Sequence, residues 1–212
     1  RAFIRACQEN GIPYNPDFNG PVQEGAGAYQ VTIRNAKRCS AAVAYLHPIL
    51  KRSNIALETN CLVRKIVIEK GRATGVEYVK DGDLKTVRAE SEVLVTSGAI
   101  GSPKLMLLSG VGPAAHLRET GIDVVHDLPG VGENLQDHFM APMAWELNPG
   151  FFTYNNELTG FPLIKNVLRY YLTKHGPMTI PAAQVGAFIK SDPALDRPDL
   201  QYHCLPVAGD LE

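Results

Sequence analysis

Hydrophobic residues recur with a helical period near the start of the chain and with a strand period in its centre. Residues 2–10 form an amphipathic helical pattern that ends at Gly11 and Pro13, which is typical of a helix C-terminus. Ser40 precedes the apolar run A-A-V-A-Y-L-H-P-I-L, so we expect it to cap a second helix, with Pro48 near its end. After this helix the pattern changes to alternation, which indicates strands.

Alternating segments at 54–59, 62–69, 73–80 and 85–89 predict four successive strands. Gly71 separates the second from the third, and D-G-D at 81–83 supplies a hairpin turn. These short connections predict an antiparallel meander. The next segment, 92–96, is apolar with little alternation, which favours a strand covered on both faces in a parallel sheet.

Small residues line the turn that follows, S-G-A-I-G at 97–101. Ser102 as cap and Pro103 at the first helical position predict a helix that runs to Gly110. A strand, a small-residue turn and a helix allow the backbone to approach a phosphate or a ribose closely, although many such turns only pack. The sequence leaves both roles open.

Two glycine patterns resemble nucleotide-binding fingerprints but lack their context. Gly25 and Gly27 form a G-x-G with no buried strand before it and no helix after it, so we interpret them as close-packing positions. Gly110, Gly112 and Ala115 spell G-x-G-x-x-A after residues that are helical, so we expect these glycines to end one helix and start the next.

The rest of the chain predicts a strand at 122–126, a loop of turn-forming residues at 128–138, and a change of composition near Phe139. A segment rich in proline, glycine and aromatic residues follows at 142–160. We then expect a helix at 163–174 and strands at 184–190 and 200–205.

Composition limits the function classes. With 212 residues, 45% of them hydrophobic and 20% charged, the chain has the composition of one or two globular domains. A net charge of −1 without a long basic run argues against nucleic acid as a partner. The sequence has no apolar stretch of about 18–20 residues and its first residues do not form a signal peptide. We expect a cytoplasmic location, with membrane association of a longer protein left open.

The cysteines and histidines show no metal-binding or disulfide pattern. Cys7, Cys39, Cys61 and Cys204 are widely spaced, so we expect reduced, buried thiols and no bound metal. His203 and Cys204 would point to opposite faces of a strand. Because the sequence starts without methionine and stops without a closing element, we expect a piece of a longer protein.

Several blocks, in order, resemble the glucose-methanol-choline (GMC) flavin oxidoreductases. The most specific are Gly98-Ala99-x-x-Ser102-Pro103 and S-G-V-G at 109–112, which are similar to the family's second signature. N-P-D-F-N-G, T-I-R-N-A-K-R-C-S-A-A-V-A-Y-L, L-P-G-V-G-E-N-L-Q-D-H and R-P-D-L-Q-Y-H support the resemblance, which spans essentially the whole chain.

The resemblance implies an α/β plus α+β fold: part of a doubly wound FAD-binding domain with the meander as an antiparallel insert, and part of an antiparallel-sheet substrate domain. It implies three regions: 1–39 on the substrate side and connecting, 40–138 in the FAD domain, and 139–212 in the substrate domain. Members pass hydride from an alcohol to flavin N5. The cofactor-binding residues that it implies are Val63, Gly98, Ala99, Ser102, Asn134, Asp137 and His138.

The resemblance also implies what this chain lacks. The family's G-x-G-x-x-G lies upstream of residue 1 and its histidine base lies downstream of residue 212, so we expect no catalytic residue here. His138, His175 and His203 do not match the catalytic position. We therefore expect the isolated chain to be inactive and not to retain FAD. The missing N- and C-terminal parts of the same protein are its implied partners.

On the substrate side, Gln184 and Phe188 stand in a Q-x-G-x-F block where members usually have E-x-G-x-F. Glutamine offers a dipole but no charge, which makes choline doubtful and favours a small uncharged alcohol. The electron acceptor stays open, as does the choice between oxidase and dehydrogenase. An FAD-containing lyase and a non-catalytic module stay open as alternatives. The turn at Asn35-Ala36 stands where the family usually has N-G. Alanine adopts a positive φ angle less readily than glycine, so a turn with two positive φ angles is less favourable here.

Overall fold

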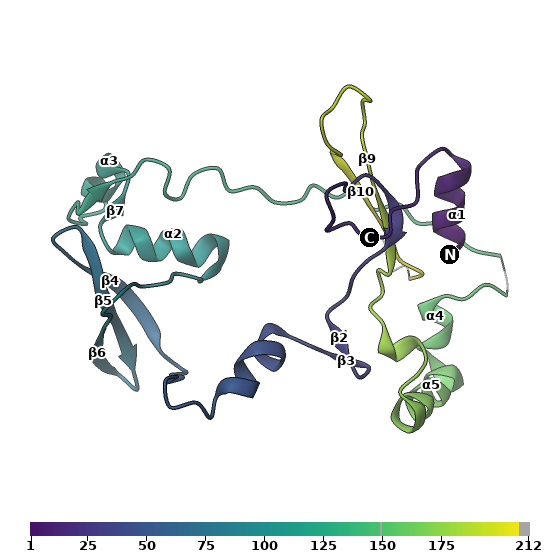
Figure 1. Cartoon of the computed structure of the whole chain (residues 1–212), viewed down its shortest axis with the longest axis horizontal. Helices are drawn as coiled ribbons and strands as arrows, with labels where there is room; N and C mark the ends of the chain where they lie inside the picture. The colour runs from purple at the N-terminus through teal and green to yellow at the C-terminus, as the bar shows by residue number, and fades with distance from the viewer. Residues whose placement is uncertain (149, 208–212) are drawn as a thin grey trace. The chain divides into compact units, whose positions relative to one another are not determined.

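The computed structural model describes residues 1–148 and 150–207 (Figure 1). Contacts divide the chain into two compact units: Arg1–Arg52 with Pro142–Glu212, and Ser53–Ala141. Residues 40–52 thus belong to the first unit by contacts. The division at 39/40 and 138/139 was inferred from roles toward a cofactor and stays a prediction.

A three-stranded antiparallel sheet organises the first unit, in the order β1 (Gly25–Ala28), β9 (Val185–Ile189), β10 (Leu200–Cys204). Helix α1 (Ala2–Glu9) packs on one face, where Cys7 contacts the fully buried Ala26 and Ala187. The predicted amphipathic helix and both predicted strands are confirmed. Their apolar positions coincide with this small core.

Glycines let other segments lie close against β1 and β9. A Cβ at Gly25 would lie 2.7 Å from the carbonyl oxygen of Pro13, and one at Gly27 would overlap the carbonyl oxygen of Asn15. The close-packing role predicted for these two residues is confirmed. At Gly186, on β9, a Cβ would overlap the Tyr29 hydroxyl, so all three sheet glycines admit a neighbour that a side chain would displace.

The remaining elements of the first unit are short. Strands β2 (Ile33–Arg34) and β3 (Lys37–Arg38) form a hairpin, followed by the helical turns η1 (Ala42–Leu46) and η2 (His47–Ile49). Ser40 Oγ accepts the amide of Val43 at 3.3 Å, as its capping role predicts. The run is a π-turn and a 3-10 turn rather than a regular α-helix: the His47 amide reaches back to the carbonyl of Ala42, and Pro48 has no amide to donate.

Helices α4 (Tyr154–Glu157) and α5 (Gly160–Thr173) and the turn η3 (Pro177–Thr179) complete this unit. The sequence did not predict α4, which is one turn long and is capped by Thr153 Oγ1 accepting the amide of Asn156 at 3.2 Å. Helix α5 begins three residues before its predicted start. Lys174 ends it in the left-handed conformation, with φ +58°.

The second unit contains the predicted meander: β4 (Leu62–Glu69), β5 (Arg72–Lys80) and β6 (Asp83–Arg88), paired antiparallel in that order. Asp81 and Gly82 both have positive φ, as a two-residue hairpin turn requires. The predicted strand at 54–59 is wrong, because this segment forms a turn and irregular backbone that pairs with no described strand.

Beyond the meander lie α2 (Gly98–Leu108), β7 (Val111–Gly112), α3 (Ala114–Glu119) and β8 (His126–Asp127), with β7 and β8 paired in parallel. The predicted buried strand at 92–96 is wrong: it joins no described strand, and Leu94 is 77% exposed. The strand predicted at 122–126 reduces to the two residues of β8. The fold is thus mixed α/β with antiparallel sheets, and its description as part of a doubly wound domain stays a prediction.

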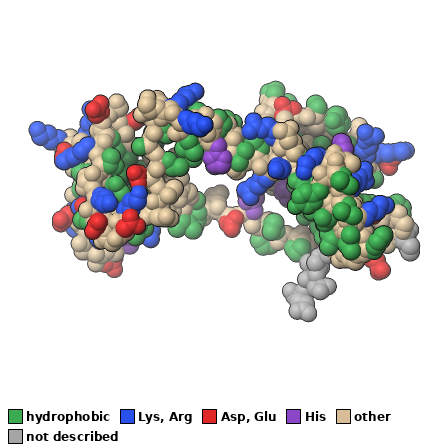
Figure 2. Space-filling view, turned by 90° about the horizontal axis from the view of Figure 1, so that it is seen from below, with side chains coloured by type: hydrophobic (Ala, Val, Ile, Leu, Met, Phe, Trp, Pro, Cys, Tyr) green, Lys and Arg blue, Asp and Glu red, His purple; other side chains and the backbone are tan. Residues whose placement is uncertain are grey.

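Many hydrophobic side chains lie at the surface, among charged residues of both signs, as Figure 2 shows for one face. The expectation of buried thiols holds for Cys7 alone, since Cys39, Cys61 and Cys204 are partly exposed and all four thiols are free. None of the described helices has the length and apolar character needed to cross a bilayer.

Candidate cofactor-side and substrate-side surfaces

Helix α2 begins at Gly98, five residues before Pro103, its predicted first helical residue. Gly98 adopts φ +82°, and Ser97, which precedes it, is the N-cap residue. Ser102 lies inside the helix, where its Oγ accepts the Ser97 amide at 3.0 Å, and Pro103 is also interior. Gly101 permits this tight first turn because a Cβ there would lie 2.9 Å from that of Ser97. The prediction of Ser102 as cap is therefore wrong.

The N-terminal turn of α2 is open to solvent. Residues 96–100 are all exposed, and a Cβ at Gly98 would meet no atom within 4 Å. The requirement for glycine is thus its backbone conformation and not space. Exposed amides at a helix N-terminus favour an oxygen-rich or anionic group. Gly98 and Ala99 lie at this end, as a backbone cradle requires.

The other end of α2 is fixed by the S-G-V-G block. Buried Ser109 donates its hydroxyl to Leu105 O at 2.6 Å and accepts the amide of Ile66, on β4, at 2.8 Å. A Cβ at Gly110 would lie 2.8 Å from Val125 Cγ2 and overlap the Asp123 carbonyl oxygen. Gly110 and Gly112 follow the end of α2 and pack closely against neighbouring residues, so the residues before G-x-G-x-x-A are helical as predicted.

Val63 lies on β4, which is an edge strand among the described residues. It pairs with Tyr78 of β5, is 38% exposed, and stands beside a register shift between Val63 and Lys65. Helix α2 contacts β4. The structure therefore brings together the two elements that carry Val63 and Gly98, and leaves backbone groups near Val63 accessible.

Asn134, Asp137 and His138 lie in an exposed loop after β8. Asn134 has φ +57°, and the His138 amide donates to Asp137 Oδ1 at 2.7 Å. In the described parts of the chain, no hydrogen bond or ion pair joins these three residues to α2. A Cβ at Gly132 would lie 3.8 Å from Leu107 Cδ1, so this loop starts against the C-terminal half of α2.

Gln184 and Phe188 belong to the glycine-containing face of the β1-β9-β10 sheet. Gln184 Nε2 donates to the hydroxyl of buried Tyr154 at 3.0 Å. Phe188 packs edge-on against Phe18, with ring centroids 4.9 Å apart. Because Gly186 lies between them on the strand, both side chains point to one side. Gln184 and Phe188 thus lie on one face of the sheet, and their role toward substrate stays a prediction.

Sequence reasoning missed two tyrosines on this face. Tyr29 contacts Phe188 and stacks on His203 with centroids 5.2 Å apart, and its hydroxyl donates to Tyr202 O at 2.9 Å. Burial raises the pKa of Tyr29, which a hydrogen bond from Gln201 partly opposes. Burial likewise raises the pKa of Tyr154 against a hydrogen bond from Gln184. Both phenols are therefore neutral near neutral pH.

The N-P-D-F-N-G block positions Phe18 on the same face. Buried Asn15 donates to the carbonyls of Val22 and Glu24 at 2.9 and 3.0 Å and accepts the Asp17 amide at 2.8 Å. This loop therefore acts as a structural support for the aromatic cluster. Phe18, Tyr29, Tyr154, Gln201 and His203 contact this face through rings, a phenol and an amide. A carboxylate lies at the end of the sheet, where Glu24 pairs with Lys190 at 3.6 Å.

Within the described residues, no three His, Cys, Asp or Glu side chains form a group that could hold a metal ion. The site chemistry of this chain is therefore that of exposed backbone amides in one unit and of an uncharged aromatic and amide surface in the other.

Comparison with solved structures places this fold among flavin-dependent oxidoreductases. The chain is similar to an FAD-dependent oxidoreductase from Chaetomium thermophilum, at 28% identity and a TM-score of 0.76, with 88% of this chain and 33% of that one covered. It is also similar to a fungal aryl-alcohol oxidase at 28% identity and a TM-score of 0.74, over 88% of this chain and 32% of that one.

The GMC oxidoreductase family model matches residues 1–140. An oxygen-dependent choline dehydrogenase from Brucella suis biovar 1 (strain 1330) is 44% identical over 207 residues, which are 98% of this chain and 37% of that protein. The chain therefore belongs to the GMC oxidoreductase family, and it spans little more than a third of the length of this relative.

Proposed function

We propose that this chain is part of a longer FAD-dependent oxidoreductase that oxidises the CH–OH group of an uncharged alcohol by hydride transfer to flavin. Family membership supports the reaction class. The fold shared with an FAD-dependent oxidoreductase supports the cofactor. The Gln184–Tyr154 pair is the observation that supports an uncharged alcohol over a cationic one.

The exposed surface supports a longer protein. A folded monomer of this mass is expected to expose about 9,700 Å², whereas the chain exposes 16,521 Å². The difference far exceeds the roughly 600–1,500 Å² of an inter-domain interface, so no arrangement of the two units removes it. Apolar side chains such as Trp145 and Phe139, 74% and 97% exposed, would be covered by the remaining parts of the protein.

The second unit fits the adenosine half of FAD. The first turn of α2 offers exposed amides. Gly98 has a positive φ there, and Ser102 Oγ accepts the Ser97 amide within the same turn. The accessible edge of β4 near Val63 offers backbone groups to a base edge. When bound, FAD supplies the hydride acceptor. We assign Gly98, Ala99 and Ser102 to the ribose or phosphate side and Val63 to the adenine side, with Asn134, Asp137 and His138 in a loop near the cofactor.

The first unit would supply one wall of the substrate cavity. Tyr154 fixes the Gln184 side chain by accepting from its amide nitrogen, and Tyr154 in turn donates to Pro181 O at 3.5 Å. The amide nitrogen of Gln184 is thus engaged by Tyr154, and the amide oxygen is the group that would face a substrate. Among the described residues, no carboxylate contacts Gln184 or Tyr154 by a hydrogen bond or ion pair, and a carboxylate supplies a large part of the attraction for a quaternary ammonium.

The test compares choline with an uncharged primary alcohol in the full-length protein that contains this chain. We expect kcat/KM to favour the uncharged alcohol, and Gln184→Glu to shift the ratio toward choline by about tenfold or more, because a unit charge replaces a dipole. Gln8→Glu, which adds the same charge on α1 and so on the opposite face of the sheet, is the control. Preference for choline in the wild type, or equal shifts in both variants, would contradict the substrate assignment.

Two rivals have their own readouts. An FAD-containing lyase would not show anaerobic reduction of its flavin by alcohols, whereas an oxidoreductase would. A non-catalytic module would lack a G-x-G-x-x-G in the coding region upstream of residue 1. Measuring peroxide formation and dye reduction in the full-length protein then separates an oxidase from a dehydrogenase, because an oxidase passes the electrons of the reduced flavin to oxygen. The 212-residue chain alone is expected to retain no FAD and to oxidise no alcohol, and a purified sample with a bound-flavin absorbance band would contradict this.

A further inference from the structure

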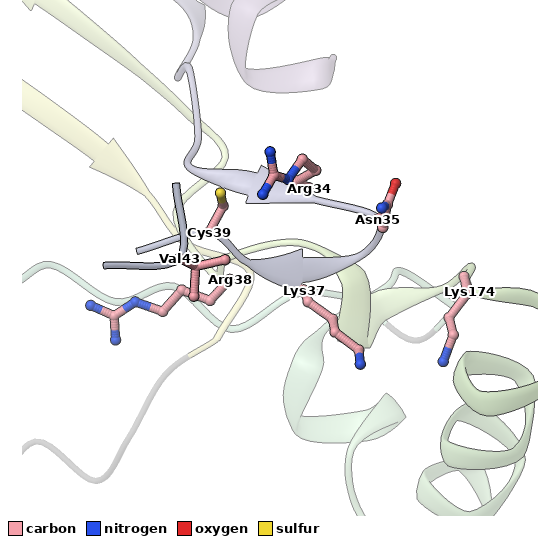
Figure 3. Close-up of a pocket in the computed structure, with 7 residues that line it drawn as sticks. All are labelled: Arg34, Asn35, Lys37, Arg38, Cys39, Val43 and Lys174. Carbon is pink, nitrogen blue, oxygen red and sulfur yellow. The ribbon is translucent and has the colours of Figure 1, made fainter. Parts of the chain in front are cut away.

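A cavity of about 500 Å³ lies beside the β2–β3 hairpin, within the first unit (Figure 3). Arg34, Lys37 and Arg38 line it from the hairpin, and Lys174 lines it from the residue after α5. We call these four residues the basic pocket. Asn35, Cys39 and Val43 complete the lining, which contains no aspartate or glutamate.

Specific contacts hold the hairpin against the end of α5. Asn35 and Ala36 form its turn with φ +52° and +56°, and the Tyr170 hydroxyl donates to Ala36 O at 3.1 Å. The ammonium of Lys174 lies 4.7 Å from the Tyr170 ring centroid and 5.3 Å from that of Tyr171. The turn and the lysine are therefore positioned by the same helix.

The hairpin and the end of α5 direct two charges to one side. Arg34 pairs with Lys37 across the hairpin, and Arg38 pairs with Ile33. In Figure 3, Lys37 and Lys174 extend in the same direction, and Arg38 extends away from them. Lys37 and Lys174 are thus the members best placed to act together, because Arg34 extends from the opposite side of the hairpin in the same view.

These charges have no acidic counterpart among the described residues. None of the ion pairs in that part of the chain involves Arg34, Lys37, Arg38 or Lys174. A cavity lined by one sign of charge concentrates counter-ions. A guanidinium offers a two-pronged donor and ammoniums offer point charges, which together match the oxygens of a phosphate group.

We propose that the basic pocket binds a phosphate group, either as free phosphate or as part of a diphosphate. This site does not rest on the proposed function, because it needs neither flavin nor alcohol. Its failure would leave the oxidoreductase assignment unchanged, and the reverse also holds.

The experiment titrates inorganic phosphate and, separately, pyrophosphate into the full-length protein that contains this chain at low ionic strength, followed by calorimetry and by NMR shifts. We expect saturable binding at one site, tighter for pyrophosphate because it carries more charge, and shifts at Asn35 and Lys174. Equal or weaker binding of pyrophosphate would identify a single phosphate as the ligand. Binding of neither anion would overturn the proposal.

Matched variants separate a site from general attraction. Lys37→Gln with Lys174→Gln should weaken pyrophosphate binding by about tenfold or more, as expected for the loss of two nearby charges. Lys165→Gln, on α5 about two and a half turns before Lys174, removes one charge outside the pocket. It is the control for Lys37→Gln alone and should change binding less than about twofold. Equal losses in Lys37→Gln and Lys165→Gln would overturn the proposal. Lys37→Gln alone, at an exposed position, gives the same test if the double variant does not fold.

Discussion

Replacing Ser109 by alanine tests how the second signature block supports helix α2. The Ser109 hydroxyl makes two hydrogen bonds, and losing them has different costs for the two partners. Leu105 O also accepts the backbone amide of Ser109 at 3.1 Å, so it stays satisfied. The Ile66 amide donates to Ser109 Oγ at 2.8 Å and loses this acceptor. An unsatisfied partly buried donor costs about 1–3 kcal/mol. We therefore expect Ser109→Ala to destabilise the contact of α2 with β4 by about 1.5 kcal/mol.

Native-state hydrogen exchange of the Ile66 amide measures this effect directly. A loss of about 1.5 kcal/mol corresponds to exchange faster by about tenfold. The control is Thr120→Ala, because the Thr120 hydroxyl makes the same backward bond at the exposed end of α3, to His116 O at 2.9 Å, and accepts nothing from a strand. We expect that control to change exchange less than about twofold. Unchanged Ile66 exchange in Ser109→Ala, or equal effects of the two variants, would refute the reasoning.

Three further predictions concern backbone and charge. Gly110→Ala should destabilise the second unit by more than about 3 kcal/mol in urea unfolding, since its Cβ would overlap Asp123 O, whereas Gly121→Ala, with φ +74° and open space, should cost only about 1 kcal/mol; similar costs would contradict the packing role. Ala36→Gly should raise stability by about 0.5–1 kcal/mol, because it relieves a left-handed alanine at the expense of unfolded-state entropy; a lower melting temperature would contradict this. Hydrogen bonds from Ser191 lower the pKa of Asp199 below 3.8. The ionised carboxylate therefore contributes to the free energy of unfolding above pH 3.8, and this contribution is lost as pH falls through the lower pKa of the folded state. NMR titration should show that the pKa of Asp199 rises in Ser191→Ala.

The sequence predicted elements whose signal is local. The meander has alternation and an Asp81-Gly82 turn, both of which act over a few residues, and α1 carries its own amphipathic pattern and stop. The segments at 54–59 and 92–96 have strand-like patterns but no partner strand among the described residues. A strand is stabilised by its neighbours, so pattern alone could not decide these two cases.

The candidate site likewise contains features with a local sequence signal and features that depend on distant residues. The neighbourhood of Gln184 and Phe188 follows from their spacing on one strand, which a sequence displays. Tyr154 and Tyr29 reach the same face from distant positions, and their spacing carries no signal of it. The start of α2 was misplaced because Ser102-Pro103 has the local chemistry of a helix start, whereas the positive φ of Gly98 allows an earlier one.

The second signature block thus divides its tasks between the two ends of one helix. With 11 residues, α2 is about 16 Å long and behaves as a rigid rod. Ser109 and Gly110 fix its C-terminal end to β4 and to the β7–β8 region, and this fixes where the open amides at Gly98 lie. A change at Ser109 should therefore lower FAD affinity in the full-length protein without any contact between Ser109 and the cofactor. Because the effect acts through position, Ser109→Ala should weaken FAD binding while the Ile66 amide loses protection in parallel, and Thr120→Ala should change neither.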